Sequence, residues 1–94
     1  MAPTWTASTA KHGVDRADAI YAILNATFTE ILAFERPAKG RIRLFIGPRH
    51  AQALEGDEVE ILVHEFPDSD QQAVVFHVMP LGAKYRNYRE ESHK

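Results

Sequence analysis

Hydrophobic and polar residues alternate through the middle of the chain, and this pattern predicts four β-strands. The predicted strands run from Phe28 to Glu35, from Arg41 to Gly47, from Glu58 to Phe66 and from Ala73 to Met79. Segments of Pro, Gly, Asp and Ser, typical of turns, follow the first and the third strand. Because consecutive strands joined by short turns pair antiparallel, the pattern predicts a four-stranded meander.

Helical spacing of apolar residues appears on both sides of the strands. The clearest stripe predicts a helix that Asp15 begins and Asn25 ends, and its apolar residues are Ala17, Ile20, Tyr21 and Leu24. We also predict a short first helix over residues 5–12, which a glycine closes, and a last helix over residues 81–88, which follows Pro80. Helices beside an antiparallel sheet define the α+β class, and we expect them to cover its apolar face.

Composition agrees with one globular domain spanning residues 1–94, with frayed ends at 1–4 and 91–94. The chain has 94 residues, of which 45% are hydrophobic and none is cysteine, so disulfides and thiolate metal sites are excluded. No apolar run approaches the roughly 20 residues of a membrane span, and no signal peptide is evident. We therefore expect a soluble, cytoplasmic protein that does not bind membranes.

Charge is distributed unevenly along the chain. The formal net charge is −2, yet residues 48–79 carry one basic and seven acidic groups. Residues 1–47 carry six basic and four acidic groups, and residues 80–94 carry four and two. Because a nucleic-acid-binding domain usually has a clearly basic balance, any RNA site on this chain has to be local.

One mixed face of the predicted sheet is the best candidate for chemistry. If the strands pair in order, it gathers Arg41, Arg43, His64 and His77, and the last helix adds Lys84, Tyr85 and Arg86. Arginines bind phosphate oxygens through bidentate hydrogen bonds, and a histidine can move a proton at neutral pH. The alternative is a solvated sheet face on which arginines and glutamates pair across strands.

Other kinds of site find little support in the sequence. No two histidines have the spacing of a metal site on a helix, and no serine lies on a strand-to-helix elbow. We therefore expect no metal and no cofactor. Lys11 and His12, between the first two predicted helices, are either a basic end of the first helix or a pair that faces substrate.

Two motifs together resemble the BrnT-like toxins of the RelE superfamily. The first is Lys11-His12-Gly13-Val14, which leads into an acidic, alanine-containing helix. The second runs from Val74 through His77, Met79 and Pro80 into the Lys84-Tyr85-Arg86 helix, and it is similar to an actinobacterial variant of the family. The order of the strands between the motifs agrees, so the resemblance covers most of the chain.

The resemblance implies a compact microbial ribonuclease fold and a type II toxin. Such toxins are metal-independent endoribonucleases that cleave RNA, with mRNA as a candidate substrate, inhibit translation and are neutralised by an antitoxin protein. Carried over by position, the catalytic candidates are His77, Arg43 and Lys84, and the substrate-binding candidates are Arg41, His64, Lys11, His12, Tyr85 and Arg86. Whether the domain forms a homodimer stays open.

A non-catalytic module of the same fold, which acts through protein contacts, is the alternative, and its candidate contact surfaces are Tyr85, Tyr88 and the acidic region 48–70. It is favoured by the acidic net charge and by a departure from the commoner family pattern. That pattern ends the last strand with serine and arginine, where this chain has His77 and Met79. The ribonuclease hypothesis requires Arg43 and His77 to share a face of the sheet.

Overall fold

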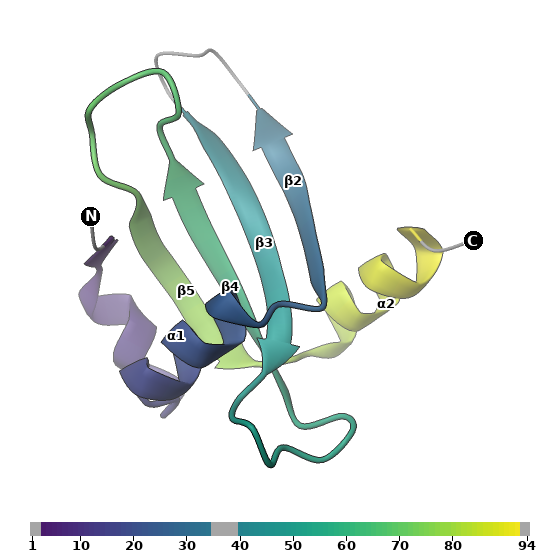
Figure 1. Ribbon diagram of the computed structural model, residues 1–94. Helices are drawn as coiled ribbons and strands as arrows, with labels where there is room; N and C mark the ends of the chain where they lie inside the picture. Colours follow the sequence, from purple (N-terminus) through teal and green to yellow (C-terminus); the bar gives the residue numbers. More distant parts are fainter. Residues whose placement is uncertain (1–2, 35–39, 93–94) are drawn as a thin grey trace.

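The computed structural model describes residues 3–34 and 40–92 and has an α+β fold (Figure 1). Its elements are β1 (Thr4–Trp5), the 3-10 helix η1 (Ala7–Ala10), α1 (Arg16–Leu24), β2 (Phe28–Phe34), β3 (Arg41–Pro48), β4 (Glu58–Glu65), β5 (Val74–Pro80) and α2 (Ala83–Ser92). The α+β class is confirmed, and each predicted long strand has a counterpart whose described bounds differ by one residue at most. Glu35, the predicted end of the first strand, lies outside the described residues.

The sheet has five strands, not the predicted four, in the order β1-β5-β4-β3-β2. Strands β2 to β5 form the predicted antiparallel meander. β1 adds a parallel strand at the edge, because Thr4 pairs with Val74 and Trp5 with Val75. Alternation could not reveal β1, since a strand of two residues shows no period.

The ends of the chain are more ordered than predicted. Thr4 was expected in a frayed end and Trp5 in a helix, yet both lie in β1, and the first helix shrinks to η1. Glu91 and Ser92 continue α2, whereas residues 1–2 and 93–94 lie outside the described residues. Of the predicted turn at 37–40, only Gly40 lies within the described residues.

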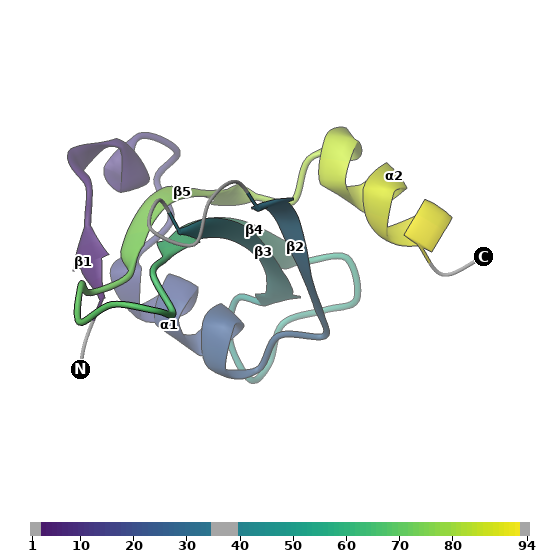
Figure 2. The same ribbon diagram turned by 90° about the horizontal axis from the view of Figure 1, so that it is seen from above.

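The two faces of the sheet carry separate apolar clusters, so the helices lie on opposite faces and not on one. α1 packs on a cluster that includes Val59, Ile61 and Val63. α2 packs on the other face, through its two tyrosines, against a cluster that includes Leu44, Ile46 and Leu81. Seen from above, the sheet arches over α1, and α2 lies apart from it beside the other end of the sheet (Figure 2).

Helix α1 packs against the sheet through a face that the sequence stripe did not indicate. Its buried residues are Ala19 and Ala22, both fully inaccessible to solvent. Ile20 and Leu24 were expected in the core, yet they are 42% and 77% exposed. The small alanines permit close approach to β3, where a Cβ on Gly47 would overlap the Ala22 carbonyl.

A β-bulge in β5 changes which residues share a face. Leu62 pairs with His77, but Val63 pairs with Val75, so Phe76 is the extra residue. We expected strict alternation, with Val75 and Val78 on different faces. Both are instead buried in the α1 cluster, because the bulge adds one residue between them.

Candidate active site

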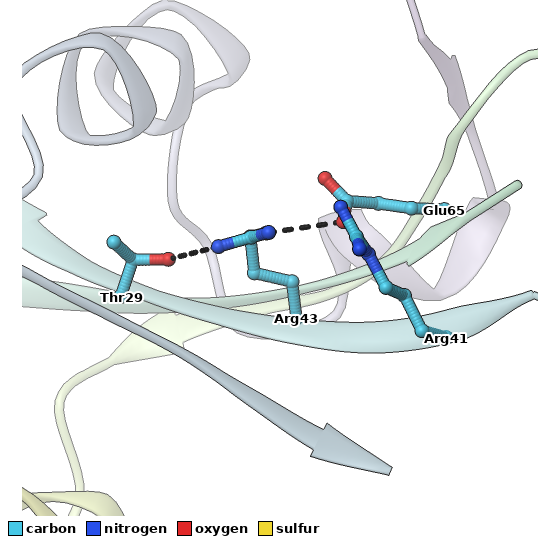
Figure 3. Close-up of polar contacts among 4 residues, drawn as sticks. All are labelled: Thr29, Arg41, Arg43 and Glu65. Carbon is cyan, nitrogen blue, oxygen red and sulfur yellow. Dashed lines mark hydrogen bonds and ion pairs between the residues drawn. The ribbon is translucent and has the colours of Figure 1, made fainter. Parts of the chain in front are cut away.

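Arg41 and Arg43 form a small ion-pair cluster on the α1 face of the sheet. Their Nε atoms lie 2.8 and 3.0 Å from the same carboxylate oxygen of Glu65 (Figure 3). Arg43 also donates a hydrogen bond from Nη1 to the Thr29 hydroxyl, at 3.1 Å. The cluster resembles the solvated arrangement of paired charges that was the alternative to a phosphate site.

The pKa of the Glu65 carboxyl reflects this cluster. Partial burial raises the pKa, but hydrogen bonds and charge from Arg41 and Arg43 outweigh burial and hold it below its ordinary value. Glu65 is therefore ionised at neutral pH, and one negative charge is shared between two positive ones.

The expectation that Arg43 and His77 share a face is wrong. Arg43 pairs with Val63, whose side chain is buried in the α1 cluster. His77 pairs with Leu62, which packs against the α2 cluster. Since neighbouring residues of a strand point to opposite faces, Arg43 and His77 lie on opposite sides of the sheet.

The same register separates the remaining candidates. Arg41 lies on the arginine side, because it pairs with Glu65. His64 lies on the side of His77, beyond Leu62, and its ring packs on Phe66 with centroids 4.4 Å apart. Arg41 and Arg43 are therefore excluded from the candidate site, whereas His64 and His77 remain candidates.

His77 is held by a buried carboxylate that the sequence analysis missed. Glu60, on the neighbouring strand, is only 3% exposed. Its Oε2 lies 2.8 Å from Nε2 of His77, and its Oε1 accepts a hydrogen bond of 2.8 Å from the Gly82 N–H, just before α2. One feature of the sequence could have indicated this carboxylate. Glu60 stands inside an apolar run, between Val59 and Ile61, where a buried carboxylate requires hydrogen-bond partners.

A carboxylate on Nε2 determines what the imidazole can do. With Nε2–H donating to Glu60, neutral His77 carries its lone pair on Nδ1. A ring that is fixed by a carboxylate and exposes its other nitrogen is suited to act as a general base. The side chain of His77 is 27% exposed, so solvent and solutes reach it.

His12 lies beside His77, although 65 positions separate them along the chain. Their ring centroids are 6.0 Å apart, in an edge-to-face arrangement. The turn that carries His12 follows η1. Ser8 of η1 donates a hydrogen bond from its hydroxyl to the Phe76 carbonyl and so holds η1 against β5. Gly13 ends the turn with a φ of 73°, a conformation that glycine adopts without strain.

The beginning of α2 completes the surroundings of His77. A hollow of about 390 Å³ adjoins its ring, and Lys84 and Tyr85 line it together with Glu60. The Lys84 ammonium lies 5.2 Å from the centre of the Tyr85 ring, while Tyr85 itself packs on the α2 cluster. The site therefore combines two imidazoles, a buried carboxylate and a cation.

Two further candidates lie outside this group of contacts. Lys11 is exposed next to His12, and no contact in the described part of the chain joins it to His77. Arg86 is exposed and donates a hydrogen bond of 3.2 Å to the Leu81 carbonyl. Tyr88 packs edge-to-face on Phe28, so it helps to fix α2.

The chain matches no family model, no curated protein and no solved structure. Among the described residues, no group of three or more His, Asp or Glu side chains is arranged to hold a metal ion. Within the same residues, no helix is long and apolar enough to cross a membrane. The chemistry of the His77 site therefore rests on its own geometry.

Proposed function

We propose that the chain is a metal-independent endoribonuclease of the toxin type, with a compact RelE-like ribonuclease fold, and that its active site is formed by His12, His77 and Glu60. One observation carries the proposal. The two histidines of the two resemblance motifs lie together, and one of them is hydrogen-bonded to a buried carboxylate. The form of the hypothesis that required Arg43 and His77 on one face is wrong, so this proposal differs from it: His12 takes the place of Arg43 beside His77, and Arg41 has no part in the site.

Two proton transfers describe the proposed reaction. Nδ1 of His77 removes the proton of a ribose 2′-hydroxyl, whose oxygen attacks the adjacent phosphorus. Protonated His12 gives its proton to the leaving 5′-oxygen, so the products are a 2′,3′-cyclic phosphate and a free 5′-hydroxyl. Glu60 stabilises the imidazolium that forms at His77, and Lys84 stabilises the charge on the phosphate oxygens.

A cytoplasmic toxin of this kind would be neutralised by an antitoxin protein and would act on cellular RNA. Induction of the chain in a bacterial host tests this part of the proposal. We expect growth arrest and loss of intact RNA with wild type and with Arg43→Ala, and normal growth with His77→Ala at equal protein levels. Arrest by wild type and His77→Ala alike would contradict the proposal.

A non-catalytic protein-interaction domain is the second candidate. It is supported by the two arginines on the α1 face, both of which are bonded to Glu65, and by the net charge of −2. Under this candidate, His77→Ala keeps the biological activity of wild type. Tyr85 and Tyr88 pack on the α2 cluster, so the acidic region 48–70 is the stronger of the candidate contact surfaces.

A further inference from the structure

An apolar groove opens on the α1 face, on the opposite side of the sheet from His77. Its volume is about 580 Å³, within the range of about 300–1,000 Å³ that ligand pockets occupy. Phe45, Val63 and Val75 lie on the sheet side of the groove, and Ile23 of α1 forms a wall. Figure 2 shows α1 beneath part of the arched sheet, on the face that carries the groove.

The wall formed by α1 continues outside the groove as exposed apolar surface. Ile20, Ile23 and Leu24 have the spacing that places side chains on one side of a helix. Ile20 and Leu24 are exposed because the smaller Ala19 and Ala22 face the sheet instead. Neighbouring large apolar side chains left in solvent are typical of a surface that binds another protein.

The opposite rim of the groove is acidic. Asp70 lines the groove from the β4–β5 connection, and Asp68 is exposed two residues earlier. Among the residues that the structure describes, no basic side chain pairs with either aspartate. Four other acidic residues of the segment 48–79 do have cationic or histidine partners: Asp57, Glu58, Glu60 and Glu65.

We propose that this groove binds a segment of a partner protein that presents a large apolar side chain next to lysine or arginine. The apolar side chain fills the groove beside Ile23, and the cation meets Asp68 and Asp70. Glu65 also lines the groove, but it is already paired with Arg41 and Arg43, so Asp68 and Asp70 are the charges that favour a cation on the partner. This inference does not depend on the ribonuclease proposal, because the groove and His77 lie on opposite faces.

Selection of peptides from a displayed library of random dodecamers tests the inference with the intact protein. We expect the enriched peptides to share an aromatic or branched apolar residue within two positions of lysine or arginine. Synthetic copies, labelled with fluorescein, then give dissociation constants by anisotropy. Enrichment of acidic peptides, or no enrichment, would overturn the inference.

Three variants locate the binding. Ala73→Trp places a large side chain in the groove and should abolish binding. The melting temperature of this variant, compared with wild type, checks that it folds. Asp68→Asn combined with Asp70→Asn should weaken binding roughly three- to tenfold at low salt, and less at high salt. Glu55→Gln, the control on the β3–β4 connection, should leave the affinity unchanged.

Other occupants give different results. Unchanged affinity in Ala73→Trp places the peptide elsewhere and contradicts the inference. A wild-type dimer that Leu24→Lys converts to a monomer, together with no peptide binding, assigns the groove to a second copy of the chain and likewise contradicts it.

Discussion

Replacement of Glu60 by glutamine separates the chemistry of this carboxylate from its structural role. The amide has the same shape, and its oxygen can still accept the hydrogen bond from the Gly82 N–H. Its NH₂ group then faces Nε2 of His77, which has to accept instead of donate. The proton of the neutral imidazole moves to Nδ1, the atom that the mechanism needs as a base.

The expected effects on activity and on stability therefore differ in size. A histidine in the wrong tautomer loses about 10²- to 10⁴-fold in cleavage rate, as in a catalytic triad whose carboxylate becomes an amide. Glu60→Gln exchanges charge-assisted hydrogen bonds for neutral ones and should lower the free energy of unfolding by about 1–2 kcal/mol. Glu60→Ala removes both acceptors and should cost about 2–4 kcal/mol.

Two measurements on the same sample check this reasoning. Urea unfolding gives the stability, and the ¹⁵N shifts of the imidazole ring in NMR spectra give the tautomer of His77. Glu58→Gln is the control, since Glu58 also loses its charge and also contacts α2, through two hydrogen bonds from Arg89 at 2.7 and 3.1 Å. A Glu60→Gln variant that folds, has the changed tautomer and still cleaves RNA at the wild-type rate would refute the proposed role of Glu60.

Two further predictions concern the other face of the sheet. Glu65→Gln should lower stability at pH 7 by about 1 kcal/mol, because a partly exposed carboxylate shared by Arg41 and Arg43 contributes little more. The pKa of Glu65 in the folded protein lies below 4.5, so this contribution is present above that pH and is lost as pH falls through the folded pKa. Urea titrations at acid pH should therefore give the same stability for wild type and Glu65→Gln. Gly47→Ala should destabilise the fold by about 2 kcal/mol or more, because its Cβ overlaps the Ala22 carbonyl; thermal unfolding measures this loss, and an unchanged melting temperature would contradict the close packing.

The sequence was sufficient to predict the positions of the long strands, but it did not predict which face of the sheet each side chain occupies. Alternation and turn residues located β2 to β5, since both signals act within a few residues. Which face a residue occupies depends on pairing between strands. Arg43 opposes Val63 and not Leu62, and a shift by one residue would have put both arginines on the face of the sheet that carries His77.

The candidate site was predicted in part for the same reason. The motifs identified His12 and His77 separately, but their contact depends on η1 crossing to β5 through Ser8. Glu60 was missed because its partners, His77 and Gly82, lie 17 and 22 positions away along the chain. The exposure of Leu24 was missed because helical spacing cannot distinguish a stripe that meets the sheet from one that meets solvent.

Cleavage of a synthetic single-stranded RNA by the purified protein in EDTA tests the central claim most directly. We predict that wild type and Arg43→Ala yield fragments with 2′,3′-cyclic phosphate ends, identified by mass spectrometry, and that His77→Ala and His12→Ala yield essentially none. The rate should rise and then fall with pH, because one histidine acts neutral and the other protonated. No cleavage by wild type, or equal cleavage by His77→Ala, would contradict the account.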